Sequence, residues 1–162
     1  MILRELPGRP IEVLFMKRAE REGDPWSGQV AFPGGRRDRN EGDLAETVVR
    51  ETLEETGIDL KAHGELIGAL DELRPRTPVL PPVIVRPYVA RLDSDLPMTP
   101  SDEVASLFWS PLDTLADPAN TRATRVQARG KFWMWHDAIH YDGHVIWGMT
   151  ERIIRAFGGI VG

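Results

Sequence analysis

The sequence predicts an α/β fold in which helices flank a mixed β-sheet. Short segments rich in β-branched residues recur along the chain between Pro- and Gly-rich turns, as strands do. Two longer segments, Leu44–Thr56 and Thr150–Phe157, carry apolar residues at helical spacing. Strands interspersed with few helices suit a sandwich around a mixed sheet. No internal repeat or polar linker interrupts the sequence, so we expect residues 1–162 to form a single domain.

The first third of the chain predicts a hairpin, a strand and a helix. Ile2–Glu5 and Ile11–Lys17 are expected strands joined by a turn that contains Pro and Gly. After a charged loop, Gly28–Phe32 is predicted as a strand that the Pro33-Gly34-Gly35 run ends. The helix over Leu44–Thr56 follows.

The rest of the chain predicts more strands and a final helix. Further elements are expected as strands at Glu65–Leu70, Val83–Leu92 and Val104–Trp109 and as a short helical segment at Pro111–Ala116. Lys131–Tyr141 and His144–Trp147 flank Asp142-Gly143, a dipeptide that favours a tight hairpin turn. Thr150–Phe157 is expected to form the last helix and to stop at Gly158-Gly159.

Composition excludes several classes of protein. The 20 Lys and Arg residues against 25 Asp and Glu give a formal charge of −5, which disfavours a nucleic-acid or anionic-membrane partner. A small anionic substrate is still compatible. The absence of cysteine excludes disulfides, thiol nucleophiles and iron–sulfur clusters. No apolar run reaches the ~18–20 residues that a membrane span needs, so a cytoplasmic protein is expected.

The helix over Leu44–Thr56 has the most informative pattern. Asp43 and Glu46 form a capping box, D-x-x-E, and Gly57 occupies the position of a helix C′ residue. One stripe that should face the sheet is formed by Leu44, Ala45, Val48, Val49 and Leu53.

Three carboxylates lie on one side of this helix. At about 100° per residue, Glu51, Glu54 and Glu55 share about 100° of arc, and Glu55 borders the apolar stripe. Like charges this close repel, and a divalent cation with oxygen ligands would neutralise them. Arg50 can pair with Glu46 and with Glu54 at i±4, which would orient one carboxylate. A solvated acidic face with Arg50 pairs is the alternative.

The residues before the helix suit phosphate. Gly34 and Gly35 let the backbone approach a ligand closely and expose its carbonyls or amides. The guanidinium groups of Arg36, Arg37 and Arg39 suit phosphate oxygens through bidentate hydrogen bonds. Singly, these features also fit an ordinary turn and a solvated loop. Together with the carboxylates they predict a site for metal plus phosphate.

The same residues resemble a known motif. Gly35-(x)5-Glu41-(x)8-Arg50-Glu51-Thr52-Leu53-Glu54-Glu55-Thr56-Gly57-Ile58 resembles the Nudix box, G-x5-E-x7-R-E-U-x-E-E-x-G-U with U aliphatic. It differs by one extra residue before Arg50 and by Thr52 at an aliphatic position. The stretch G-Q-V-A-F-P-G-G-R-R-D, residues 28–38, is similar to one in the coenzyme A pyrophosphatase branch of that family. The L-R-x-H element usual before it is replaced by Gly23–Ser27.

The resemblance implies a Nudix-type α/β/α sandwich and a Mg²⁺- or Mn²⁺-dependent hydrolase. Its substrate would be a nucleoside diphosphate linked to another group, and coenzyme A or a derivative is the first candidate. ADP-ribose, dinucleoside polyphosphates and oxidised nucleoside triphosphates are alternatives, and a non-catalytic nucleotide-binding or adaptor domain is an alternative of another class. The implied metal ligands are Glu51, Glu54, Glu55 and the Gly34 carbonyl.

The motif gives less information about the general base and about base stacking. Arg50 would orient the glutamates, and the general base would be Glu51 or Glu103, with Asp71 or Glu72 ranked third. Trp26, beside the glycine-rich strand, is the best candidate to stack on a base. Packing roles are expected for Trp109, Trp133, Trp135 and Trp147. Trp133 and Trp135 share one strand face, which fits either a core or the surface of a homodimer.

Overall fold

The computed structural model describes residues 1–74, 83–128 and 132–161 and is built around a six-stranded sheet. The strands are β1 (Ile2–Arg4), β2 (Glu12–Arg18), β3 (Val30–Ala31), β4 (Gly64–Ala69), β5 (Tyr88–Leu92) and β6 (Val104–Pro111). Their order is β3-β2-β1-β5-β4, and β6 also pairs with β2. β1 pairs with β5 in parallel and with β2 antiparallel, so the expected mixed sheet is confirmed.

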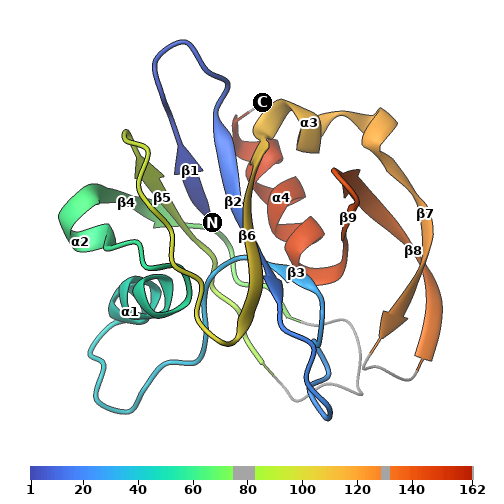
Figure 1. Ribbon diagram of the computed structural model, residues 1–162, viewed down its shortest axis with the longest axis horizontal. Helices are drawn as coiled ribbons and strands as arrows, with labels where there is room; N and C mark the ends of the chain where they lie inside the picture. The colour runs from blue at the N-terminus through green and yellow to red at the C-terminus, as the bar shows by residue number, and fades with distance from the viewer. Residues whose placement is uncertain (75–82, 129–131, 162) are drawn as a thin grey trace.

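Helices cover both faces of this sheet. They are α1 (Leu44–Thr56), α2 (Leu60–His63), α3 (Leu112–Ala116) and α4 (Gly148–Val161), with a 3₁₀ turn at Pro118–Asn120. Figure 1 shows α1 and α2 on one side of the sheet and α3 and α4 on the other. This is the expected α/β/α arrangement. In the described part of the chain, no helix has the length and apolar character needed to cross a membrane.

The period of two along each strand divides the interior into two cores. Leu3 and Phe15 point to the core that holds Ile154 and Phe157 of α4. Their chain neighbours Ile2 and Leu14 point to the other core, which contacts α1 and α2. Because both faces of the sheet are buried, its strands are apolar at successive positions rather than at alternate ones.

A second sheet extends from the α4 side of the molecule. Its order is β7 (Thr121–Ala128), β8 (Phe132–Tyr141) and β9 (His144–Ile146). The turn at Asp142-Gly143 is confirmed, with Tyr141 opposite His144. β7 was not among the expected strands, because TRATRVQA has a single large aliphatic residue, Val126, and therefore no apolar alternation.

Two tryptophans of β8 are on the surface. Trp133 is 56% exposed and Trp135 71% exposed, so of the two alternatives for their shared face the core is wrong for both. β9 pairs with Ile139, His140 and Tyr141, so the part of β8 that carries the two tryptophans is paired with β7 but not with β9. Trp109 does pack, as expected, against the core on the α1 side. A homodimer through this surface stays a prediction.

Several element boundaries differ from the expected ones, and three of the differences are informative. β3 has two residues because Gly28 has a φ of +69° and the Gln29 N–H donates to the Trp26 carbonyl in a turn. β5 begins at Tyr88 rather than at Val83, and Val85 instead forms a bridge with Leu73.

The third boundary is the end of the last helix. α4 continues through Gly158 and Gly159 to Val161, so the expected stop is wrong. Neither glycine has a positive φ, and a glycine ends a helix only where it adopts the left-handed conformation.

α1 has the expected ends, and Val48 and Val49 of the expected apolar stripe pack against the core, but the stripe is not buried throughout. Asp43 accepts a hydrogen bond from the Ala45 N–H, and Gly57 caps the other end with a φ of +77°. Leu53, expected in the apolar stripe, is 46% exposed. The fully buried positions of the helix are Thr47, Thr52, Glu55 and Thr56.

Hydrogen bonding explains how this polar face is buried. The Thr56 hydroxyl donates to the Thr52 carbonyl at 2.6 Å and accepts from the Ile58 N–H at 3.2 Å. A buried hydroxyl with both partners carries little desolvation cost. The helix therefore turns Glu55, rather than Leu53, toward the sheet.

The capping glycine gives a stability prediction. Gly57→Ala should lower the free energy of unfolding by about 1–2 kcal/mol, because the left-handed conformation is strained for residues with a Cβ. The added Cβ would also lie 3.1 Å from the Thr99 amide nitrogen. Chemical denaturation measures the change.

Gly158→Ala is the matched control. Its added Cβ would meet no atom within 4 Å, and Ala is favoured over Gly in a helix by about 0.8–1.0 kcal/mol. We expect this variant to be more stable than the parent. Equal destabilisation by the two substitutions would contradict both the Gly57 cap and the continuation of α4.

Candidate active site

The guanidinium of Arg50 connects the carboxylates of α1 with the loop before it. Its nitrogens lie 2.7 Å from Glu41 Oε1, 2.9 Å from Glu51 Oε1 and 3.0 Å from Glu54 Oε2. Arg50 also donates to the Arg36 carbonyl. The hydrogen bond to Glu41 is the main cause that raises the pKa of Arg50.

One expected partner of Arg50 is bonded elsewhere. Glu46 Oε2 accepts from the Gly42 N–H at 2.8 Å, and no ion pair joins Glu46 to Arg50 in the described residues. Glu46 thus helps to cap the helix one residue before Asp43, rather than completing the capping box on Asp43 itself.

Glu41 is a structural member of the site that the expected set of site residues did not include. It accepts hydrogen bonds from Arg50 Nε, from the Thr47 hydroxyl at 2.6 Å and from the Asp38 N–H at 2.8 Å. These donors, Arg50 first, lower the pKa of Glu41 to about 2. The signal in the sequence was the first glutamate of the box, whose spacing from Arg50 is one residue longer than usual.

Glu55 is buried beside the glycine pair. It is 6% exposed, and its Oε2 accepts a hydrogen bond from the Gly34 N–H at 2.8 Å. Burial raises the pKa of Glu55 to about 7, against the Gly34 hydrogen bond that lowers it; the charges of Glu51 and Glu103 also raise it. The raised pKa indicates that no nearby cation fully compensates the negative charge of the Glu55 carboxylate near neutral pH.

Glu51 lies directly against Gly35. A Cβ built on Gly35 would be 2.2 Å from Glu51 Oε1 and 2.6 Å from its Oε2, so only a residue without a side chain leaves room for this carboxylate. Burial raises the pKa of Glu51, and Arg50 opposes that shift. The sequence showed the glycine pair and the glutamate but not their contact.

The loop before β6 brings a fourth carboxylate near. The Thr99 N–H donates to the Thr56 carbonyl at 2.8 Å, and the Ala19 N–H donates to the Glu103 carbonyl at 2.8 Å. These bonds hold the loop between α1 and the end of β2, and the exposed Glu103 side chain pairs with Arg21 at 3.0 Å.

The structure brings together part of the expected metal set. Glu51, Glu55 and the Gly34–Gly35 backbone adjoin one another, whereas Glu54 is 57% exposed and paired with Arg50. Over the described ranges, no three His, Asp or Glu side chains converge on one point. The donor set nevertheless fits a hard divalent cation chemically, since it consists of carboxylate and carbonyl oxygens and has uncompensated negative charge.

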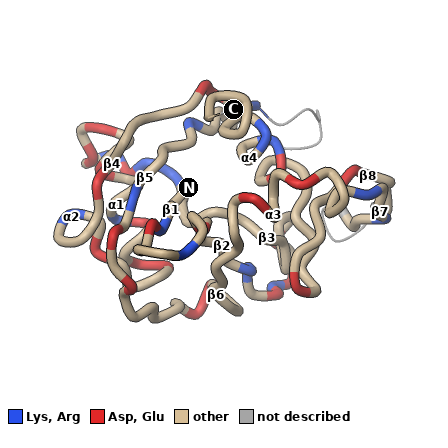
Figure 2. Tube along the Cα trace, turned by 90° about the horizontal axis from the view of Figure 1, so that it is seen from above, with Lys and Arg blue, Asp and Glu red and all other residues tan. Residues whose placement is uncertain are grey.

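The expected substrate-binding residues differ in their surroundings. Arg37 donates to the Glu41 carbonyl at 2.7 and 3.1 Å and so closes the loop. Arg36 and Arg39 have exposed side chains on that loop. Trp26 is half-buried in the turn before β3. Figure 2 shows positions of both charge signs close together around α1.

The third-ranked acids lie away from this group. Asp71 and Glu72 follow β4, and Glu72 pairs with Arg86 at 2.9 Å. The positive charge of Arg86 therefore compensates the negative charge of Glu72.

Comparison with known sequences identifies relatives of this arrangement. The family described as "NUDIX domain" matches residues 1–132. A protein of Enterobacter sp. (strain 638), named uncharacterized Nudix hydrolase NudL, is 34% identical over 166 residues, covering 96% of this chain and 76% of that protein. An uncharacterized protein of Schizosaccharomyces pombe is 40% identical over 119 residues, and the match covers 68% of this chain but only 35% of that protein.

Solved structures share the fold. The NUDIX domain of Shewanella oneidensis NrtR, complexed with ADP ribose, is 16% identical with a TM-score of 0.63, covering 99% of this chain and 85% of that one. The Nudix hydrolase RenU of M. smegmatis is 24% identical with a TM-score of 0.58, covering 72% and 70%. With the box residues arranged around Arg50 and the domain match over most of its length, the chain belongs to the Nudix hydrolase family.

Proposed function

We propose that this chain is a divalent-metal-dependent pyrophosphohydrolase acting on nucleoside diphosphate derivatives. The observation that carries the proposal is the placement of Glu51 and Glu55 against the Gly34–Gly35 backbone. Glu55 has one backbone hydrogen bond and, among the described residues, no ion pair. A buried acid without an ion-paired cation, beside a second acid that shares Arg50 with Glu41 and Glu54, favours metal binding over a solvated acidic face.

Mg²⁺ or Mn²⁺ would be held by Glu51, Glu54, Glu55 and the Gly34 carbonyl. When bound, such an ion supplies Lewis acidity to phosphate oxygens and lowers the pKa of water. Arg50 orients Glu51 and Glu54, and Glu41 fixes Arg50 in turn. Such supporting partners set the direction in which ligand oxygens point.

We assign proton removal from the attacking water to Glu103. Glu51 is half-buried and its Oε1 is bonded to Arg50, so it has fewer acceptor sites left for water once it also ligates a metal. Glu103 is exposed, is held near Glu55 by its loop, and is paired only with the surface residue Arg21 among the described residues. In the described ranges no ion pair involves Arg36 or Arg39, which are proposed to bind phosphate, and Trp26 is proposed to stack on the base.

Coenzyme A, or a derivative of it, is the substrate we propose first. The G-Q-V-A-F-P-G-G-R-R-D stretch supports it. The alternatives are ADP-ribose, dinucleoside polyphosphates and oxidised nucleoside triphosphates; the S. oneidensis neighbour is complexed with ADP ribose. A C. elegans neighbour that is 23% identical, with a TM-score of 0.56 over 69% of this chain and 76% of that one, is an Ap4A hydrolase. A substrate panel with products identified by mass separates these, since coenzyme A would give 3′,5′-ADP and 4′-phosphopantetheine.

The box glutamates provide the first test. Glu51→Gln and Glu55→Gln should each reduce metal-dependent turnover by at least about 100-fold, because loss of supporting partners alone costs about 10–100-fold. Glu46→Gln, on the same helix but bonded to Gly42, is the matched control and should keep its activity. Full activity in Glu55→Gln would refute the proposed site.

Glu103→Gln separates the general base from the metal ligands. We expect its kcat to fall roughly 10²–10⁴-fold, with unchanged Mn²⁺ affinity measured by electron paramagnetic resonance. Glu51→Gln should lower both kcat and the affinity for Mn²⁺. If Glu103→Gln keeps its kcat, the assignment of the general base to Glu103 is refuted.

Metal affinity should depend on pH through Glu55. Because the pKa of Glu55 is raised to about 7 in the metal-free protein, an ion must displace a proton below that pH. The apparent Mn²⁺ affinity should therefore fall as pH decreases from 7, by up to about tenfold per unit, and change little through this group above about 7. Titrations at pH 6, 7 and 8 measure it, and a flat profile from 6 to 8 would contradict the role of Glu55.

A further inference from the structure

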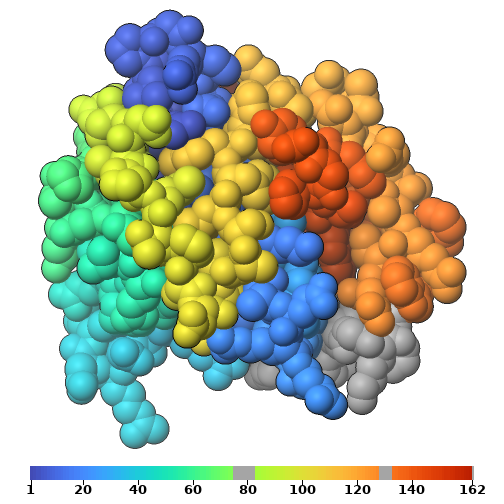
Figure 3. Space-filling model, viewed as in Figure 1, coloured from blue at the N-terminus to red at the C-terminus, as the bar shows by residue number. Residues whose placement is uncertain are grey.

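A cavity of about 300 Å³ lies between the β2–β3 segment and the three-stranded sheet. Lys17 and Gln29 line it on one side, and Arg125, Trp133, His144 and Trp147 line it on the other. In Figure 3 the blue surface of the segment after β2 borders the orange surface of that sheet. The volume is at the lower end of the range that holds small ligands, about 300–1,000 Å³.

The charge of this cavity is unusual for the chain. Two permanent cations, Lys17 and Arg125, line it, and no Asp or Glu does among the described residues, although the protein has a net charge of −5. Within the described part of the chain, neither cation has an ion pair with a carboxylate. The cavity therefore offers two positive charges to a ligand.

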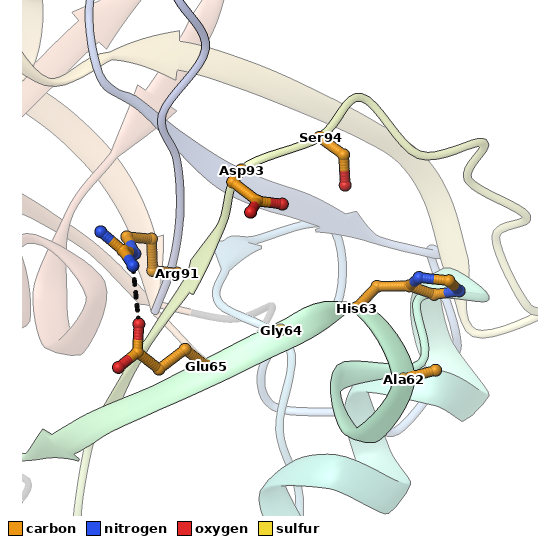
Figure 4. Close-up of a pocket in the computed structure, with 7 residues that line it drawn as sticks. All are labelled: Ala62, His63, Gly64, Glu65, Arg91, Asp93 and Ser94. Atoms are coloured by element: carbon orange, nitrogen blue, oxygen red, sulfur yellow. Dashed lines mark hydrogen bonds and ion pairs between the residues drawn. The ribbon is translucent and has the colours of Figure 1, made fainter.

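A second surface depression differs from this cavity in how its cation is paired. Figure 4 shows the depression between α2 and β5, where Arg91 bonds to Glu65 at 2.8 Å and also pairs with Glu5 at 3.6 Å. The cation there is already compensated by two acids. It offers little to an anion, which makes Arg91 a suitable control position.

Aromatic rings complete the charged cavity. The Arg125 guanidinium lies 5.2 Å from the centroid of the Trp133 ring, a cation–π contact that restrains it. The His144 ring stacks on Phe108 at 3.8 Å with an interplanar angle of 5°, so its orientation is fixed as well. Rings beside paired cations suit a ligand with a flat heterocycle and a phosphate.

One short segment connects this cavity to the carboxylates. Val30 lines the cavity, and Gly34, four residues later, donates to Glu55. Four extended residues span at most about 14 Å. A nucleotide can therefore place its diphosphate at Glu51 and Glu55 and its nucleoside in the cavity.

Resting on the proposed function, we propose that this cavity binds the nucleoside half of the substrate and that Lys17 and Arg125 select a nucleoside with a further phosphate monoester. The two negative charges of that monoester would match the two cations. Coenzyme A carries such a group on its ribose, whereas ADP-ribose and 3′-dephospho-coenzyme A do not.

Paired substrates test the selection. The ratio of kcat/KM for coenzyme A to that for 3′-dephospho-coenzyme A should be at least about tenfold, the value of one charge-assisted hydrogen bond or more. In Lys17→Met/Arg125→Met the ratio should fall toward one, because Met keeps an apolar chain of similar length but has no charge. Arg91→Met should keep the parent ratio.

Binding of product-like probes gives a readout independent of turnover. By calorimetry, 3′,5′-ADP should bind at least about tenfold tighter than 5′-AMP, and the double variant should lose this preference. Equal binding of the two probes, with equal hydrolysis of both substrates, would overturn the inference and leave the proposed function standing. If neither substrate is hydrolysed, coenzyme A hydrolysis is refuted, and the comparison of 3′,5′-ADP with 5′-AMP alone decides the role of the cavity.

Discussion

The ion pairs of Arg50 are the interaction on which the rest of the site depends. Three glutamates bond to one guanidinium, which also holds the carbonyl of Arg36. Without that cation the carboxylates of the helix would repel one another, and the preceding loop would lose its ion pair to the helix. A single positive charge does not balance three negative ones, so the arrangement is ordered and still anionic, which is the condition a divalent ion requires.

The helix that carries these groups is attached to the sheet in an uncommon way. Its buried face contains Thr52, Thr56 and Glu55 beside the aliphatic residues Val48 and Val49. The Thr56 hydroxyl bonds within the helix, whereas the Gly34 N–H bonds to Glu55 from another segment. The bond from Gly34 fixes the rotation of the helix more narrowly than apolar contact does, because it is directional. The direction in which Glu55 points is thus set by contacts in the interior.

Local signals in the sequence were sufficient for some elements and not for others. The ends of α1 could be predicted because Asp43 and Gly57 are caps that act within one turn. Leu53 was misplaced because helical spacing gives a stripe about 180° wide and does not tell which part of it the sheet covers. The contact between Gly35 and Glu51, and the cavity that joins Lys17 to Arg125, arise from segments far apart in the chain. Neither could be read from a local pattern.

Gly35 has a consequence for how this protein can change. The loop around it is exposed, and the three atoms nearest to an added Cβ belong to the far end of the Glu51 side chain. A methyl group there would move one carboxylate and leave both cores as they are. With Glu51 in its proposed role as a metal ligand, a single added carbon would remove activity while the architecture is kept, so a folded but inactive descendant is one substitution away.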